Sequence, residues 1–288
     1  MTAPPSRRVV AETVAEWEPG TFVENLAAGP DGSWLVTIPS HRRIDRVDRD
    51  GHTAVFAELD RRPTGIVADG AGALVLAGSI GDGNWQLVRA DQGRCEVVGD
   101  LPELLFGNGM ERAGERLLAM DSALGLVLDI DAGSGDSAVW LRDPSLSTPD
   151  PNTPMPGANG VAVHQDRVYI SNTARALLLR CPLARRELEV VAENLAADDF
   201  AVHPDGAIFL ATHHGNSVVE LSPDGSRTEL ASREQGLAGS TAVALDPEAP
   251  DVLYVTTTGG MRGLDDRDGE PARLVRLRLD PDARAGAT

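Results

Sequence analysis

The sequence is poor in aromatic residues, in cysteine and in basic residues, and each shortage narrows what the protein can be. Phenylalanine, tryptophan and tyrosine make up 4% of the 288 residues, and the only cysteines are Cys95 and Cys181. Two cysteines in different parts of the chain do not form the disulfide framework of a secreted scaffold, so we expect reduced thiols and a cytoplasmic protein. Acidic residues outnumber basic ones by 44 to 26, which gives a net charge of −18. A field of this sign repels phosphate backbones and argues against nucleic acid as a partner, but it does not oppose a bound cation.

Long apolar runs are missing as well. No segment approaches the roughly 20 residues of a membrane-spanning helix, and residues 1–17 lack the apolar stretch of a signal peptide. We therefore expect no membrane partner. The 30 glycines and 19 prolines indicate many turns rather than long helices. A chain of this length can bury the core of one large all-β domain, and we predict a single domain over residues 1–288.

A repeat with a period near 40 residues runs through the chain. Each copy has a polar opening residue, an apolar run, a turn rich in Gly, Asp or Pro, and a second aliphatic run, as in ANGVAVHQDRVYISNT and DDFAVHPDGAIFLATH. Second hairpins such as VVELSPDGSRTELAS add two further strands. Six copies predict an all-β fold, a six-bladed β-propeller with four antiparallel strands per blade. The alternative is a β-sandwich or barrel of hairpins, which lacks a sustained period.

The blades are expected at residues 22–60, 61–101, 102–143, 155–194, 195–234 and 237–280. The last repeat has no fourth strand, whereas residues 7–16 form a strand without a repeat of its own. We therefore expect the N-terminal strand to join the last blade and close the ring, because closure removes exposed sheet edges.

The opening residues are the candidate functional residues, since the first strand of each propeller blade lines the central channel. All six are polar: Glu24, Thr64, Asn108, Asn159, Asp198 and Ser240. Equivalent repeats would place them in a ring at one mouth of the channel. Solvation of a water-filled channel explains Thr64 and Ser240 well. It explains the other four poorly, because carboxylates brought near one axis repel each other unless a cation lies between them.

Carboxylates and side-chain amides in one ring predict a divalent metal. Ca²⁺ takes about 6–8 hard oxygen ligands, and no cluster of Cys or His points to zinc. We expect Ca²⁺, with Mg²⁺, Mn²⁺ or Zn²⁺ as alternatives. The expected ligands are Glu24, Asn108, Asn159, Asp198 and Asp199.

At these residues the chain resembles the gluconolactonase-like superfamily of six-bladed propellers, which includes regucalcin and luciferin-regenerating enzyme. The resemblance covers nearly the whole chain and is carried by ENLAAGPDG, NGMERAGERLLAMDSALG, NGVAVHQDRVYISNT, ADDFAVHPDGAIFLAT and LYVTTTGG. It implies a catalytic divalent metal at the channel mouth, held by Glu24, Asn108, Asn159 and Asp198. Asp199 matches a position where the more distant paraoxonases also place a ligand.

Two departures from the family pattern argue against gluconolactone as the substrate. Leu105, Phe106 and Gly107 stand where regucalcin-like enzymes place an arginine before the asparagine, and Glu24-Asn25-Leu26 replaces the usual Glu-Gly-Pro. The opening is similar to that of a fungal and bacterial branch that includes hetero-Diels–Alder cyclases of natural-product pathways. Strictosidine synthases, which are also six-bladed, use the same channel mouth for a condensation.

Long loops on the mouth side are expected to form a pocket for a small molecule with an apolar body. They span residues 101–107, 142–158 and 256–272, and Phe106, Met155 and Met261, with Trp85, can form an apolar wall. The substrate-binding set is completed by three of the opening residues: Asn108, Thr64 and Ser240.

Asp198 and His213 are the catalytic candidates, because a histidine at the same mouth can act as acid or base. Asp121 and Asn172 close the second strands of two blades and are expected to support the site. We predict a metal-dependent hydrolase of a lactone or ester. The alternatives are a natural-product cyclase acting through a Diels–Alder or Pictet–Spengler-like step, and a propeller scaffold without catalysis. We expect a monomer or a weak homodimer.

Overall fold

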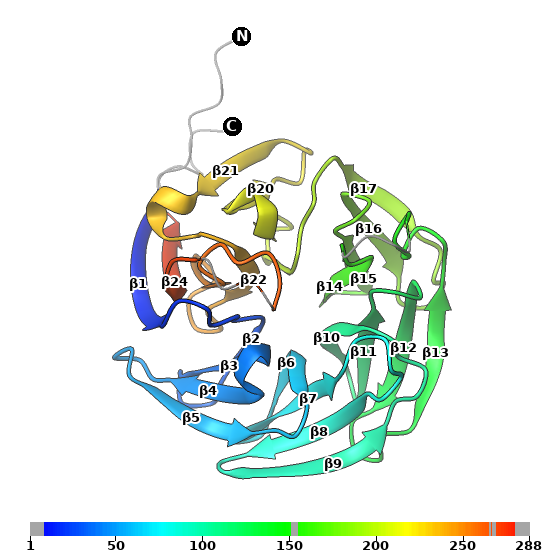
Figure 1. Ribbon diagram of the computed structural model, residues 1–288. Helices are drawn as coiled ribbons and strands as arrows, with labels where there is room; N and C mark the ends of the chain where they lie inside the picture. Colours follow the sequence, from blue (N-terminus) through cyan, green and yellow to red (C-terminus); the bar gives the residue numbers. More distant parts are fainter. Residues whose placement is uncertain (1–8, 151–154, 265, 267–268, 280–288) are drawn as a thin grey trace.

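Six four-stranded antiparallel sheets are arranged in a ring around a central channel (Figure 1). The computed structural model describes residues 9–150, 155–264, 266 and 269–279. The prediction of an all-β, six-bladed propeller is confirmed. Helical structure in the described residues is limited to three short 3₁₀ turns: η1 (Pro39–His41), η2 (His213–Gly215) and η3 (Arg233–Gln235). None of the described helices is long and apolar enough to cross a membrane.

Five blades run outward from the channel in chain order, and in the sixth the N-terminal strand of the chain is the outermost strand. Blade 1 contains β2 (Leu26–Ala28), β3 (Trp34–Ile38), β4 (Arg43–Val47) and β5 (Thr53–Glu58). Blade 2 contains β6 (Arg62–Asp69), β7 (Gly72–Gly78), β8 (Gln86–Asp91) and β9 (Arg94–Asp100). Blade 3 contains β10 (Gly107–Ala113), β11 (Arg116–Asp121), β12 (Leu126–Asp131) and β13 (Ser137–Arg142).

Blade 4 contains β14 (Ala158–His164), β15 (Arg167–Asn172), β16 (Leu177–Pro182) and β17 (Glu189–Glu193). Blade 5 contains β18 (Phe200–Val202), β19 (Ile208–Thr212), β20 (Ser217–Leu221) and β21 (Arg227–Ala231). Blade 6 contains β22 (Ser240–Leu245), β23 (Val252–Thr257), β24 (Ala272–Leu279) and the N-terminal strand β1 (Val9–Trp17).

The N-terminal strand closes the ring, as the unpaired last repeat predicted. β1 pairs antiparallel with β24, from Val9 opposite Leu279 to Trp17 opposite Ala272. Residues 7 and 8 of the expected strand lie outside the described residues. The Trp17 indole donates a hydrogen bond to the buried Asp45 carboxylate of blade 1 (2.9 Å). The closing strand is therefore tied both to the last blade and to the first.

The core lies between neighbouring blades, where the faces of their sheets pack together. Blades 2 and 3, for example, bury Leu74, Leu76, Leu117 and Leu128 in one cluster with Trp85. Full burial of one leucine side chain contributes about 1.5–3 kcal/mol. Because each sheet is buried on both faces, its middle strands read as continuous apolar runs rather than as an alternating pattern.

A bulge in the innermost strands shapes the channel mouth. The register of the first strand shifts at residues 64–65, 108–109 and 159–160, which are an opening residue and the glycine after it. A bulge re-aims side chains and bends the strand. A Cβ on Gly109 would lie 2.4 Å from the carbonyl oxygen of Asn159, the opening residue of the next blade. Glycine thus allows adjacent blades to bring their opening residues into close contact.

Candidate metal and catalytic site

The opening residues lie at one mouth of the channel, because each is at or next to the start of the innermost strand of its blade. Four belong to β6, β10, β14 and β22: Thr64, Asn108, Asn159 and Ser240. Glu24 and Asp198 come just before β2 and β18, yet both are fixed to the second strand of their blade. Their backbone N–H groups donate to the carbonyl oxygens of Thr37 (3.0 Å) and Ala211 (2.8 Å).

The two asparagine amides are held in a defined orientation by hydroxyl groups. Asn108 Nδ2 donates to Ser122 Oγ (3.1 Å), and Asn159 Nδ2 donates to Thr173 Oγ1 (3.0 Å). Each hydroxyl donates in turn to a backbone carbonyl on the way to the next blade (2.6 and 2.7 Å). Because its proton is already used, the hydroxyl can only accept from the amide. The amide nitrogen is fixed toward the hydroxyl, and the amide oxygen is left free.

Several oxygens of the ring have no hydrogen-bond donor. Within the described part of the chain, no donor reaches Oδ1 of Asn108, Oδ1 of Asn159 or the carboxylate of Glu24. Burial, with the charges of Asp198 and Asp199, raises the pKa of Glu24 well above its ordinary value. Acceptors that lack donors beside mutually repelling carboxylates are the donor set of a hard cation. The residues present therefore supply the kinds of oxygen that a divalent metal such as Ca²⁺ takes.

Asp198 connects the asparagine side of the ring to His213. Its Oδ1 accepts from Asn159 Nδ2 (2.5 Å), and its Oδ2 lies 3.3 Å from His213 Nδ1. His213 Nε2 lies 2.6 Å from the Met261 carbonyl oxygen, so the imidazole nitrogen facing that carbonyl is the protonated one. The Phe22 ring meets the imidazole edge-on, with centroids 5.8 Å apart. His213 is thereby fixed with Nδ1 toward Asp198.

These contacts shift the pKa of His213. Burial opposes a charge on the imidazole, but the hydrogen bond and the negative charge of Asp198, with the Met261 carbonyl, outweigh it. The pKa of His213 consequently lies above its ordinary value. His214, the next residue, is exposed at the surface; partial desolvation of its imidazole and the nearby charge of His213 lower its pKa. Of the two histidines, His213 is the one that contacts the ring.

Thr64 and Ser240 use their hydroxyls to join blades. Thr64 Oγ1 donates to the Gly107 carbonyl of blade 3 (3.1 Å), and Ser240 Oγ donates to the Ser217 carbonyl of blade 5 (2.8 Å). Both side chains are buried. These contacts account for a hydroxyl at each position, and a contact with substrate stays a prediction.

Asp199 lies beside the ring, along the channel. Its Oδ2 accepts from Asn25 Nδ2 (2.8 Å) and its Oδ1 from the Phe200 N–H (2.7 Å). It lines a channel cavity of 470 Å³ together with Glu111. Burial raises the pKa of Asp199 to about 7, against the hydrogen bonds of Phe200 and Asn25 and with help from the charges of Asp198 and Glu111. Unlike Glu24, Asp199 has a donor on each oxygen.

The expected apolar wall is divided between surface and core. Phe106 and Met155 keep part of their surface exposed, although Phe106 also packs against the core cluster of blades 2 and 3. Met261 and Trp85 are buried, with 0% and 2% of their surface exposed. Met261 contributes its carbonyl oxygen, as the acceptor for His213.

Asp121 and Asn172 hold the mouth-side loops. The two oxygens of Asp121 accept four backbone N–H bonds, from Leu105, Phe106, Ala123 and Leu124. Asn172 donates to two carbonyls of the loop that follows blade 3, those of Ser145 and Ser147. Residues 151–154 of that loop, and residues 265 and 267–268 of the loop after β23, lie outside the described residues.

Sequence reasoning missed the hydroxyls that orient the ring. Ser122 and Thr173 each follow the last residue of a second strand, in the aligned triplets Asp-Ser-Ala (121–123) and Asn-Thr-Ala (172–174). That alignment was the available signal. It also missed Asn25, which carries the hydrogen bond to Asp199.

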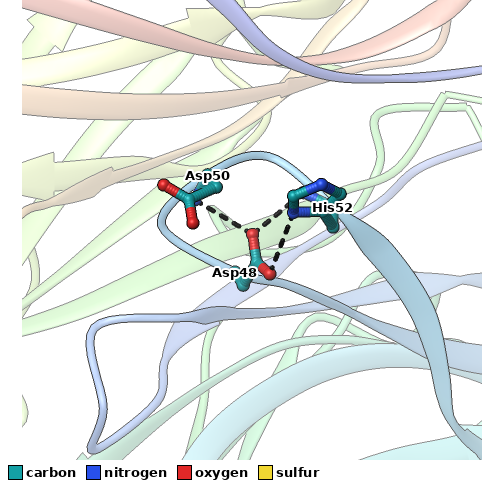
Figure 2. A group of neighbouring side chains, drawn as sticks. All are labelled: Asp48, Asp50 and His52. Atoms are coloured by element: carbon teal, nitrogen blue, oxygen red, sulfur yellow. Dashed lines mark hydrogen bonds and ion pairs between the residues drawn. The ribbon is translucent and has the colours of Figure 1, made fainter.

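A second group of metal-binding residue types lies far from the mouth, in the β4–β5 hairpin (Figure 2). Among the residues that the structure describes, only Asp48, Asp50 and His52 bring three carboxylate or imidazole ligand atoms within 4.8 Å of one another. Asp48 Oδ1 accepts the backbone N–H groups of Asp50 and His52 (both 2.9 Å). These bonds, led by that of His52, lower the pKa of Asp48. They are the bonds of a tight turn, and Asp50 and His52 are exposed, so this group needs no metal to explain it.

Comparison with known proteins establishes the fold. No family model matches the chain, and no curated protein matches it. Among solved structures, luciferin-regenerating enzyme superposes with a TM-score of 0.70 at 12% identity, covering 94% of this chain and 95% of the other. A gluconolactonase from Xanthomonas campestris gives 0.70 at 14% identity, over 96% and 91%. Regucalcin, a calcium-binding protein from Agrobacterium tumefaciens, gives 0.68 at 18% identity, over 94% and 96%.

The expected likeness to gluconolactonase-like six-bladed propellers is therefore confirmed at the level of the fold. Identities of 12–18% leave activity and ligands open. The place of the chain in a fungal and bacterial branch stays a prediction.

Proposed function

We propose that the protein is a metal-dependent hydrolase of a lactone or ester with a largely apolar body, acting at the mouth of the central channel. The observation that carries the proposal is the set of donor-free oxygens on Glu24, Asn108 and Asn159 beside Asp198. The fold also supports the proposal, because a gluconolactonase and regucalcin, a calcium-binding protein, have the same architecture as this chain. The same likeness supports Ca²⁺ ahead of other divalent ions.

Glu24, Asn108, Asn159 and Asp198 would hold the metal, with Asp199 nearby in the channel. When bound, a divalent cation at such a site supplies a Lewis acid that polarises a carbonyl oxygen. Ser122 and Thr173 orient the two amide oxygens before any ligand arrives. Such preorganisation matters because a metal binds more weakly when binding must first immobilise mobile side chains.

Asp198 and His213 are placed to move a proton. Asp198 can accept a proton from an attacking water, and its Oδ2 is 3.3 Å from His213 Nδ1, which can take that proton onward. The His213 Nε2–H stays bonded to the Met261 carbonyl, so the ring keeps its orientation while Nδ1 changes protonation. Asp198 can thus act as the general base, and His213 beside it can hold the proton.

Calcium titration and a substrate panel test the proposal. Added Ca²⁺ is expected to raise the melting temperature, because binding at a hundred times Kd adds about 2.7 kcal/mol of stability, or about 5 °C for a chain of this size. Glu24→Gln keeps the shape and removes a charge, so it should weaken Ca²⁺ binding. Wild type should hydrolyse aryl esters or aromatic lactones, and Asp198→Asn should not.

Asp82→Asn is the matched control, because Asp82 is an exposed carboxylate on a mouth-side loop of blade 2. It should leave both Ca²⁺ binding and hydrolysis unchanged. Absence of any Ca²⁺-dependent shift would remove the metal from the proposal. A protein that binds Ca²⁺ through Glu24 yet hydrolyses nothing in the panel would remove the hydrolase.

A further inference from the structure

A groove on the mouth-side face of the propeller, between blades 1 and 2, collects arginines that have no carboxylate partner. It has a volume of 670 Å³ and is lined by Arg42, Arg61 and Arg62, and Asp60 is the one carboxylate among the described residues that line it. Among the described residues, no hydrogen-bond or ion-pair partner reaches the guanidinium of Arg42 or of Arg62. In a protein of net charge −18, this is a local excess of positive charge.

The backbone holds the two arginine-bearing segments together. The Leu59 N–H donates to the Arg42 carbonyl (2.8 Å), which joins the turn after η1 to the segment that leads into blade 2. Arg42 has a positive φ of 53°, and Asn216 has one of 54° at the equivalent turn after η2. Asparagine tolerates this conformation and arginine is uncommon there. The fold thus places a free guanidinium where a smaller turn residue is the usual choice.

The third arginine is oriented without being neutralised. Arg61 Nε donates to Gln86 Oε1 (3.1 Å), and Arg61 Nη1 donates to the Asn84 carbonyl (3.0 Å). Gln86 is in turn fixed by a bond from its Nε2 to Asp100 (2.9 Å). Both acceptors of Arg61 are neutral, so its guanidinium is positioned while its charge remains available. A preorganised fork of this kind suits a planar or tetrahedral oxyanion.

Apolar surface flanks the arginines. Ile80 and Val97 line the same groove and are 55% and 52% exposed, among the most exposed large apolar residues of the described chain. Cations beside exposed aliphatic side chains match a molecule that carries an anionic group on an apolar body. All 26 basic residues of the chain are arginines. An anion in this groove would therefore be bound by planar guanidinium groups.

We propose that this groove is a binding site for an organic oxyanion, a phosphate or carboxylate group attached to an apolar moiety. Arg42 and Arg62 supply free charge, Arg61 supplies a positioned fork, and Ile80 with Val97 contacts the apolar part. None of these residues belongs to the ring of opening residues, so the site stands whether or not the proposed hydrolysis does.

Calorimetric titration with phenyl phosphate and with benzoate, at low salt and with EDTA present, tests the site. Wild type should bind at least one of them, and the one that binds more tightly shows whether the groove prefers a phosphate or a carboxylate. Benzamidine, the cationic counterpart of benzoate, should not bind. Arg42→Gln and Arg62→Gln should each lower the affinity about tenfold, as expected for loss of one charged hydrogen bond. Both arginines are exposed, so the variants should melt like wild type.

Arg94→Gln is the control, because Arg94 is an exposed arginine at the start of β9 that does not line the groove. It should bind as wild type does. Failure of both anions to bind wild type, or equal affinity in wild type and in Arg42→Gln/Arg62→Gln, overturns the proposal. Binding that is retained in Glu24→Gln separates the groove from the metal site.

Discussion

Replacing Glu111 with glutamine should flatten the pH dependence of stability in the metal-free protein. Glu111 lies in the inner strand β10 and faces the channel cavity that also contains Asp199. Burial raises its pKa to about 7, and the backbone N–H and the charge of Arg112 offset only part of the effect. The carboxylate is therefore costly to ionise in the folded chain, and glutamine removes the ionisation while keeping the shape.

The sign and size follow from the two pKa values. Below the ordinary pKa of 4.5, Glu111 is protonated in the folded and the unfolded chain, and the pH has no effect through this group. Between pH 4.5 and about 7 the unfolded chain loses its proton while the folded chain keeps it, so stability falls as pH rises. A shift of this size corresponds to about 3 kcal/mol, or about 6 °C in melting temperature for a chain of this length.

Urea unfolding in EDTA at pH 4.5 and pH 8 measures the effect. The difference in free energy of unfolding between Glu111→Gln and wild type should be about 3 kcal/mol more favourable to the variant at pH 8 than at pH 4.5. Glu115→Gln, an exposed glutamate in the adjacent turn, is the control and should show no such change. If Glu111→Gln keeps the wild-type pH slope, the carboxylate is not held in a costly environment and the reasoning is refuted.

Three further substitutions test the ring and its supports. Gly160→Ala would bring a Cβ within 2.3 Å of Asp199 Oδ1 and should cost about 2 kcal/mol in urea unfolding, whereas Gly263→Ala, with nothing within 4 Å of its Cβ, should cost nothing measurable. Thr173→Val removes the acceptor that orients Asn159 and should weaken Ca²⁺ binding in calorimetry about tenfold; unchanged affinity would show that the amide needs no such support. Asp121→Asn turns two of four accepted N–H bonds into contacts between donors and should lower stability by about 3 kcal/mol; a melting temperature within 1 °C of wild type would contradict this.

The circular arrangement of the blades was predictable because all six copies of the repeat must adopt the same local structure and pack against one another. A single segment such as residues 198–212 reads as two short strands in many folds, but six aligned segments share one channel. The spare strand at the N-terminus and the missing one after β24 then allow one closure, β1 on β24. For the same reason the opening residues could be placed at one mouth without any structural information. The repeat therefore predicted contacts between residues far apart in the sequence, which the secondary-structure propensity of one segment does not predict.

The interior of the channel escaped prediction because the bulges change which residues face it. One extra residue in a strand reverses the alternation of side chains, and the register shift between Gly107 and Met110 is such an insertion. Glu111, three residues after its opening residue, is charged, whereas the equivalent positions of the other blades are apolar: Ala27, Val67, Ala162, Ala201 and Val243. A comparison along the repeat, rather than along the strand, identifies Glu111 as the exception. The same comparison identifies Arg42, which occupies the positive-φ turn position that Asn216 occupies in blade 5. In a propeller, the informative residue is the one that departs from its five counterparts, because the fold alone already explains those that agree.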